Sequence, residues 1–248
     1  MTVRMRTVRM RGVSVAHMKG LTHPLPAFPR AALAKPETVV RLPGVSGATP
    51  AAVEDAFRRL TVILAIDDSG STQPPYGTDP RSVRYAASRS VIEWMRRHGG
   101  GRCGVLHWGS TAPARLAAGP VPVSRRMRTL RQALDQRPNL GLTVPAAALR
   151  RAARMLPKAA PGDVHAVLLI TDGEDPGEGL EEALAGLPEH VVHLMLVGDG
   201  ARHVGWEAPG VASITRLPAF DNQALTWQAG SVLAGALGLQ LRPLSASC

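Results

Sequence analysis

Five oxygen-bearing side chains stand in separate fragments of this chain, each just after an apolar run or in the loop between two elements. They are Asp67, Ser69 and Ser71 in AIDDSGST, Thr143 in LGLTVP, and Asp172 in VLLITDGE. In an open α/β sheet, residues at the carboxyl ends of parallel strands meet at one edge without being close in sequence. Two carboxylates and three hydroxyls are hard oxygen ligands, which suit Mg²⁺ or Mn²⁺ better than zinc or copper. The sequence therefore predicts one divalent-cation site and metal-dependent binding.

The spacing of the two serines fits a tight turn after the first aspartate. Gly70 permits this turn, so that Ser69 and Ser71 face one point while Asp68 faces elsewhere. Thr143 would come from a separate loop that precedes a helix. Three further acidic residues lie near enough to tune cation affinity but are interpreted as solvated loop charges: Asp68, Glu174 and Asp175.

From residue 61 onward, short apolar runs alternate with amphipathic segments, which is typical of crossover units and a mostly parallel sheet. Strands are predicted at residues 62–66, 104–108, 167–170, 191–197 and about 212–217. Helices are predicted from Thr49-Pro50, from Asp79-Pro80, at 125–134, 145–155 and 180–187, and from Asp221 to about 237. HWGSTAPARLAAG indicates a hairpin into a short antiparallel edge strand. The predicted fold is an open, doubly wound α/β sheet with helices on both faces.

In these motifs the chain resembles the von Willebrand factor A (VWA) family and its metal-ion-dependent adhesion site (MIDAS). The D-x-S-x-S motif stands as Asp67-Asp68-Ser69-Gly70-Ser71, the threonine motif as Gly141-Leu142-Thr143, and the last aspartate as Thr171-Asp172-Gly173. The resemblance covers about residues 60–237. It implies a Rossmann-like VWA fold of the stand-alone bacterial type, without catalytic activity.

The resemblance also implies a role for each site residue. Three hydroxyls, those of Ser69, Ser71 and Thr143, would ligate the ion directly, while Asp67 and Asp172 would act through water. An Asp or Glu of a protein partner would complete the coordination. Family relatives work beside ATPases or in defence and stress systems, so an adaptor role in such a complex is expected.

Two departures from the family pattern lie beside the predicted site. Leu142 stands where the family often has glycine, and residues 73–79, QPPYGTD, lengthen the loop before the first helix of the sheet. Tyr76 in this loop is a candidate specificity residue. These departures bear on the identity of the partner more than on metal binding.

The net charge of +10 is concentrated at the N-terminus, where residues 1–60 hold 10 Lys and Arg against 3 Asp and Glu. Residues 1–45 mix Arg, Pro and Gly without a periodic pattern, so they are predicted to form an extended arm, with the VWA domain spanning 46–248. Such an arm could attract the phosphates of a nucleic acid. It holds only Phe28 for stacking on bases, so nucleic-acid binding is the less favoured prediction.

No run approaches the roughly 18 apolar residues of a membrane span, and no signal peptide follows the basic start. With two cysteines, Cys103 and Cys248, no disulfide framework is expected. The protein is therefore predicted to be cytoplasmic. The preference for Arg over Lys and the abundant Ala and Pro fit a GC-rich bacterial genome.

Other interpretations of the same residues stay open. Asp67 and Asp172 are also residues that commonly begin turns. Asp67 could instead be the nucleophile of a metal-assisted phosphatase, although such enzymes generally have a second aspartate at the position where this chain has Ser69. His190 and His193 have a zinc-ligand spacing, but the second is expected to bond within a strand. Four residues are interpreted by environment alone, with the first three in the core and the last exposed: Cys103, Trp94, Trp108 and Trp206.

Overall fold

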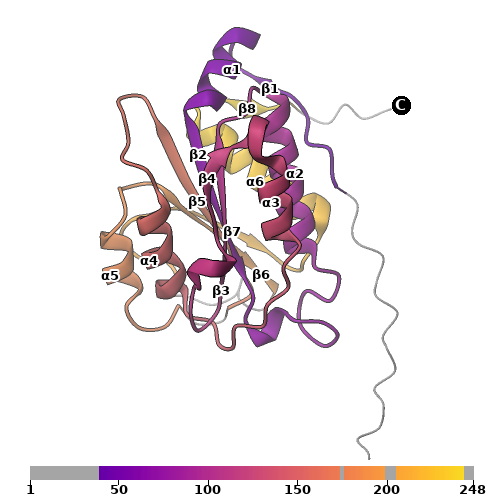
Figure 1. The fold of residues 1–248 in the computed structure, drawn as a ribbon, viewed down its shortest axis with the longest axis vertical. Helices are drawn as coiled ribbons and strands as arrows, with labels where there is room; N and C mark the ends of the chain where they lie inside the picture. The colour runs from indigo at the N-terminus through magenta and orange to yellow at the C-terminus, as the bar shows by residue number, and fades with distance from the viewer. Residues whose placement is uncertain (1–38, 174–175, 199–204, 243–248) are drawn as a thin grey trace, which may run out of the picture. The chain divides into compact units, whose positions relative to one another are not determined.

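Short aliphatic runs form the strands of a six-stranded sheet whose order is β4-β3-β2-β5-β6-β7. The structure is a computed structural model that describes residues 39–173, 176–198 and 205–242 (Figure 1). The strands of this sheet are β2 (Leu60–Asp67), β3 (Arg102–Trp108), β4 (Ala118–Pro122), β5 (Val164–Thr171), β6 (Val192–Val197) and β7 (Val211–Leu217). All neighbouring pairs are parallel except β3 and β4, which are antiparallel. The predicted mostly parallel sheet with one antiparallel edge strand is confirmed.

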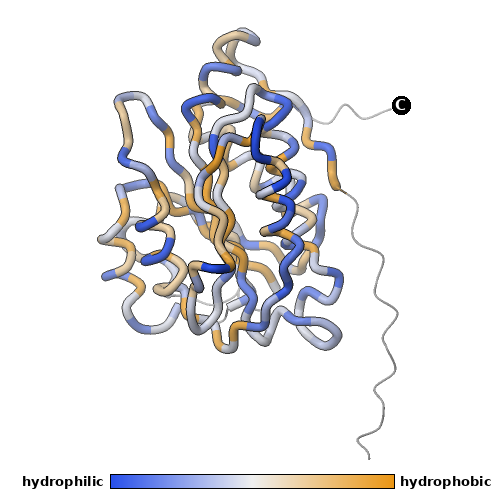
Figure 2. The backbone as a smooth tube through the Cα atoms, viewed as in Figure 1, coloured by the Kyte–Doolittle hydropathy of each residue, from blue (hydrophilic) through white to orange (hydrophobic). Residues whose placement is uncertain are grey.

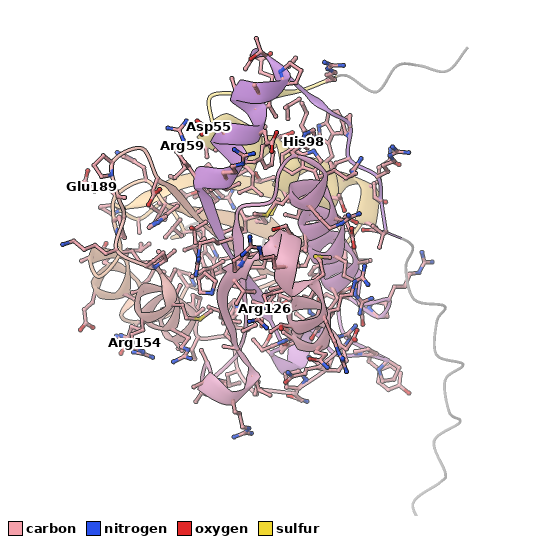
Figure 3. All side chains as sticks on the ribbon, turned by 45° about the horizontal axis from the view of Figure 1, so that its top comes forward. Asp55, Arg59, His98, Arg126, Arg154 and Glu189 are labelled. Carbon is pink, nitrogen blue, oxygen red and sulfur yellow. The ribbon has the colours of Figure 1, made fainter. Side chains whose placement is uncertain are left out.

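Helices cover both faces of this sheet. They are α1 (Pro50–Arg59), α2 (Val83–Arg97), α3 (Val123–Leu134), α4 (Pro145–Met155), α5 (Leu180–Ala185) and α6 (Asn222–Ala236), with short 3₁₀ turns at Gly70–Thr72 and Ala114–Leu116. α2, α3 and α6 lie on one side of the sheet and α4 and α5 on the other (Figure 1). Exposed arginines mark the outer surfaces of these two layers, Arg126 on α3 and Arg154 on α4 (Figure 3). The doubly wound arrangement is therefore present.

Side-chain oxygens set the starts of several helices. The hydroxyl of Thr49 accepts a hydrogen bond from the Ala52 amide, and the carboxylate of Asp221 accepts one from the Ala224 amide, as an N-cap should. The start predicted at Asp79-Pro80 is wrong by three to four residues, because α2 begins at Val83. Asp79 nevertheless caps this helix by accepting from the Val83 amide at 2.7 Å.

Two apolar cores sandwich the sheet, because successive side chains of a strand point to opposite faces. Along β2, Val62 and Leu64 belong to the core under α2 and α6, whereas Ile63 and Ala65 belong to the core under α4 and α5. The hydropathy colouring shows the strands as an apolar centre between helices with polar outer surfaces (Figure 2). β2 therefore lies inside the sheet, between β3 and β5, and ends where the predicted cation site begins.

Burial confirms three of the four environment-based interpretations. Cys103, Trp94 and Trp108 have no exposed surface. Trp206 is equally inaccessible, so the prediction that it is exposed is wrong. Its indole lies close to Gly173: a Cβ atom placed on that glycine would approach Trp206 Cζ2 to 3.6 Å.

The N-terminal boundary of the packed structure lies within the predicted arm. Leu42 and Val45 are buried at 1% and 5% exposure, and β1 (Val45–Ser46) pairs antiparallel with β8 (Gln240–Leu241). The rest of the predicted arm, residues 1–38, lies outside the described residues, as do Glu174 and Asp175. Among the helices of the described chain, none is long and apolar enough to cross a membrane.

Candidate metal centre

The first fragment of the candidate site is the turn that follows β2. Asp67 is the last residue of the strand and is fully buried, and its Oδ1 accepts a hydrogen bond of 2.8 Å from the Ser69 amide. The chain then makes the 3₁₀ turn Gly70–Thr72, which brings Ser69 Oγ and Ser71 Oγ to 3.1 Å from each other. The two serine hydroxyls therefore lie within hydrogen-bond distance of each other.

The second fragment follows β5, the strand beside β2. Asp172 comes directly after β5, and its Oδ1 accepts a hydrogen bond of 2.9 Å from the Ser71 hydroxyl. Thr171, the last residue of β5, donates its hydroxyl hydrogen to Asp67 Oδ2. Because the two parallel strands end side by side, residues more than 100 positions apart share hydrogen bonds. Four of the five predicted donors are thus joined in one chain of contacts.

The fifth donor, Thr143, lies in a loop that hydrogen bonds to the serine turn. The Gly70 amide donates to the Gly141 carbonyl at 2.7 Å. Thr143 itself packs on Gly173, where an added Cβ atom would meet Thr143 Cγ2 at 2.7 Å, so only glycine permits this approach beside Asp172. Within the described chain, no hydrogen bond joins the Thr143 hydroxyl to the other four donors. Its place is therefore adjacent to the cluster.

The electrostatics of this cluster are unusual for a buried site. Burial raises the pKa of Asp67 to about 6, and repulsion from the neighbouring Asp172 acts in the same direction. Hydrogen bonds from Thr171 and Ser69 only partly oppose this rise. Among the described residues, no arginine, lysine or histidine forms an ion pair with either carboxylate. A buried pair of carboxylates without a positive partner favours binding of a cation.

The donor set fits a hard divalent ion. Carboxylate and hydroxyl oxygens are the ligands that Mg²⁺ and Mn²⁺ prefer. In the described part of the chain, no three His, Cys, Asp or Glu residues come together as a metal-binding group. His193 instead shares a hydrogen bond of 2.8 Å with Ser213 on the next strand, as predicted for a histidine that bonds within the sheet. The residues present therefore suit the hydroxyl-rich site that the sequence suggested.

Asp68 differs from its sequence interpretation, since it is fully buried and not a solvated loop charge. Its Oδ1 accepts hydrogen bonds from Arg84 Nη2, at 3.1 Å, and from the Tyr85 hydroxyl. Its Oδ2 lies 2.6 Å from Nδ1 of His107 on β3. Arg84 also pairs with Asp79 at 2.8 Å. We refer to this group as the Asp68 network.

Two threonines near the carboxylates were not singled out from the sequence. Thr171 donates to Asp67, and Thr78 in the long loop donates its hydroxyl hydrogen to Asp172 Oδ2. Thr171 directly precedes Asp172 in the aspartate motif, which is a usable signal for its position. Thr78 has no comparable signal, because the loop returns to the site only through its folded shape.

Comparisons with known proteins support the fold. No protein-family profile and no curated protein matches this chain. Among solved structures, the von Willebrand factor type A protein from Catenulispora acidiphila matches with a TM-score of 0.51 and 17% identity, over 71% of this chain and 42% of that one. Proximal thread matrix protein 1 from the mussel byssus, in a structure with a zinc-occupied MIDAS motif, matches with a TM-score of 0.53 and 16% identity, over 74% and 47%.

A third match is the pilus adhesin SpaC from Lactobacillus rhamnosus GG, with a TM-score of 0.53 and 15% identity, over 71% of this chain and 31% of that one. This chain thus spans less than half the length of each of the three matched chains. At these identities the likeness concerns the fold. The chain has a VWA-type fold.

Proposed function

We propose that this VWA-type domain is a non-catalytic binding module that holds a divalent cation and, through it, an acidic side chain of a protein partner. Two proteins of the same fold support the proposal, since one was solved with a zinc-occupied MIDAS motif and another is a pilus adhesin. The observation that carries it lies in this chain. Asp67 and Asp172 are both buried and are linked through Ser69 and Ser71, with no basic partner among the described residues.

Each donor has a distinct part in this proposal. The hydroxyls of Ser69, Ser71 and Thr143 would ligate the ion, and Asp67 and Asp172 would supply negative charge around it. When bound, the cation supplies a positive charge and an open coordination position for a carboxylate. Asp67 is held in place beforehand by its hydrogen bonds from the Thr171 hydroxyl and the Ser69 amide.

We propose Mg²⁺ or Mn²⁺ as the ion, because all five donors are oxygens and none is a thiolate or an imidazole. Calorimetric titration of the purified chain with each ion tests this. The unmodified protein should bind one ion, and Ser71→Ala should lose most of the affinity. Ser124→Ala is the matched control, because Ser124 is exposed at the start of α3, outside the candidate site. Equal affinity of the two variants would contradict the proposal.

The geometry around Asp67 favours binding over catalysis. A nucleophilic carboxylate needs an oxygen that can reach phosphorus. Both oxygens of Asp67 already accept hydrogen bonds, and the side chain has no exposed surface. Turnover of a generic phosphate ester that disappears in Asp67→Asn would reverse this conclusion.

We also propose that the partner belongs to a cytoplasmic multi-protein system of a bacterium, such as an ATPase-associated or defence complex. Affinity capture with the full chain in Mg²⁺, repeated in EDTA and with Asp67→Ala, tests the metal dependence. Partners retained only by the unmodified chain in Mg²⁺ would support the proposal. Capture that is insensitive to both changes would contradict it.

A further inference from the structure

The candidate metal centre is bordered by two large exposed apolar side chains. Within the described residues, three large hydrophobic side chains are exposed, and two of them lie on the loops that carry the serine and threonine donors. Tyr76 is 88% exposed and Leu142, next to Thr143, is 77% exposed. Single exposed apolar residues are common on protein surfaces, so their position matters more than their number.

The loop that carries Tyr76 is closed by its own backbone. The Thr78 amide donates to the Ser71 carbonyl at 2.8 Å, and the Gly77 amide donates to the Gln73 carbonyl at 2.7 Å. At Gly77 an added Cβ atom would lie 2.4 to 2.5 Å from backbone atoms of Gln73 and Ser71, so a side chain has no room there. Tyr76 is therefore presented by a folded loop, which reduces the entropy lost when a partner binds.

A groove of about 350 Å³ is lined both by this tyrosine and by Ser71, a predicted metal ligand. Asn139 of the threonine loop also lines this groove. Pro74, Pro75 and Tyr76 are the larger apolar residues of its lining, and we refer to them as the apolar wall. A segment whose acidic side chain reached the metal centre would place a neighbouring residue in this groove.

We infer that the partner segment carries an Asp or Glu with an aliphatic or proline residue beside it, and that this apolar residue lies in the groove against Tyr76 while Leu142 contacts the same segment. The inference rests on the proposed function. Without a bound cation, the negative charges of Asp67 and Asp172 repel an acidic segment. The cation is therefore required for the charges of the site and the segment to be complementary. The apolar wall then separates this class of acidic segment from those flanked by polar residues.

Selection from a library of random short displayed peptides tests the inference. The full chain is immobilised in Mg²⁺, and bound peptides are released with EDTA. Released peptides should be enriched in Asp or Glu, with an aliphatic or proline neighbour favoured about tenfold over serine, the effect of burying one such side chain. Enrichment of the acid without any apolar neighbour would overturn the inference while supporting the proposed function.

Three serine variants test whether the preference comes from Tyr76 and Leu142. Tyr76→Ser and Leu142→Ser should keep the acidic residue in the released peptides but lose its apolar neighbour. Val39→Ser, which changes the third exposed apolar residue, should behave as the unmodified chain. If both Tyr76→Ser and Leu142→Ser still select peptides with an apolar neighbour beside the acidic residue, the inference is overturned.

Two further outcomes separate the inference from the function on which it rests. Titration with Mg²⁺ should give the same affinity for Tyr76→Ser, Leu142→Ser and the unmodified chain, because neither side chain is a predicted ligand. A loss of ion affinity in either variant would overturn the separate role given to these two side chains. If the released peptides lack acidic residues, or if EDTA releases none, the proposed function fails and the inference fails with it.

Discussion

Asp67 and Asp68 are neighbours in the sequence and are equally buried, yet their surroundings differ in charge. Asp68 contacts Arg84, and Arg84 in turn pairs with Asp79. Within the described ranges, Asp67 receives hydrogen bonds only from neutral groups, and it lies close enough to Asp172 for repulsion to raise its pKa. Burial alone therefore does not distinguish a structural carboxylate from one suited to bind a cation.

The Asp68 network also joins the elements that carry the donors. Arg84 Nη1 donates to the Thr72 carbonyl at 3.3 Å, at the end of the serine turn. The pKa of Tyr85 is raised first by burial and then by Asp68, so its hydroxyl stays protonated and donates a hydrogen bond to that carboxylate. The network thus stabilises the turn, while the other side of the same turn keeps two carboxylates without a positive partner among the described residues.

The largest expected effect comes from removing the positive charge of the network. Arg84→Met leaves Asp68 and Asp79 buried without their arginine, so the free energy of unfolding should fall by about 3–5 kcal/mol. Arg89→Met is the control, because the Arg89–Asp135 pair is partly exposed and should contribute under about 1 kcal/mol. Urea denaturation in EDTA measures both. If Arg84→Met and Arg89→Met lower the free energy of unfolding equally, Asp68 is not neutralised by Arg84 and does not differ from Asp67 in this respect.

The opposite effect is expected at Asp67. Its folded pKa of about 6 lies above the ordinary 3.8, so the folded protein is favoured by protonation at low pH and loses that stability as pH rises from about 4 to 6. Above pH 6 the ionised carboxylate lowers stability by about 3 kcal/mol. Asp67→Asn should therefore stabilise the metal-free protein at pH 8 by up to about 3 kcal/mol, and the gain should vanish near pH 4.

The neighbouring substitution is the control for this prediction. Asp68→Asn should destabilise the protein at pH 8, because Arg84 then lacks one of its two carboxylate partners. Urea denaturation in EDTA at several pH values compares the two variants. A loss of stability in Asp67→Asn at pH 8 would show that the charge of Asp67 is compensated in the metal-free protein.

A bound ion should offset the loss of stability that the ionised Asp67 carboxylate causes. At a concentration about 100 times its Kd, Mg²⁺ or Mn²⁺ should raise the free energy of unfolding by about 2.7 kcal/mol. Thr143→Ala should lose most of this gain, whereas Thr129→Ala on the exposed side of α3 should keep it. Thermal unfolding with and without the ion measures the difference. Equal gains in both variants would exclude Thr143 from the metal centre.

The positions of Asp67 and Asp172 could be predicted from the sequence, because the ends of strands can be inferred from the apolar runs. VILAI and VLLIT are each followed directly by an aspartate, so parallel pairing alone brings Asp67 and Asp172 to one edge. The partners of Asp68 were not accessible, because Arg84 and His107 come from different elements and meet it only after packing. The prediction that Trp206 is exposed was wrong for the same reason. The composition of its loop predicts exposure, whereas its burial depends on the residues that pack around it.

The smallest expected effect tests the neutral donor that holds Asp67. Thr171 donates to Asp67 Oδ2 and accepts a hydrogen bond of 2.8 Å from the Gly173 amide, so it links one carboxylate to the backbone just after the other. Thr171→Val keeps the shape but removes both bonds. Residues that orient metal ligands typically affect affinity tenfold or more, so the Kd for the ion should rise about tenfold, which is about 1.4 kcal/mol.

Thr61→Val is the control, because Thr61 is a buried threonine in β2 at the end of the strand away from Asp67. It should leave the Kd unchanged in calorimetric titration. An unchanged Kd in Thr171→Val would mean that Asp67 needs no orienting donor. A tenfold rise would show how the two aspartates diverge: Asp68 is held by a cation that neutralises it, whereas Asp67 is held by a hydroxyl that fixes its position and leaves its charge available.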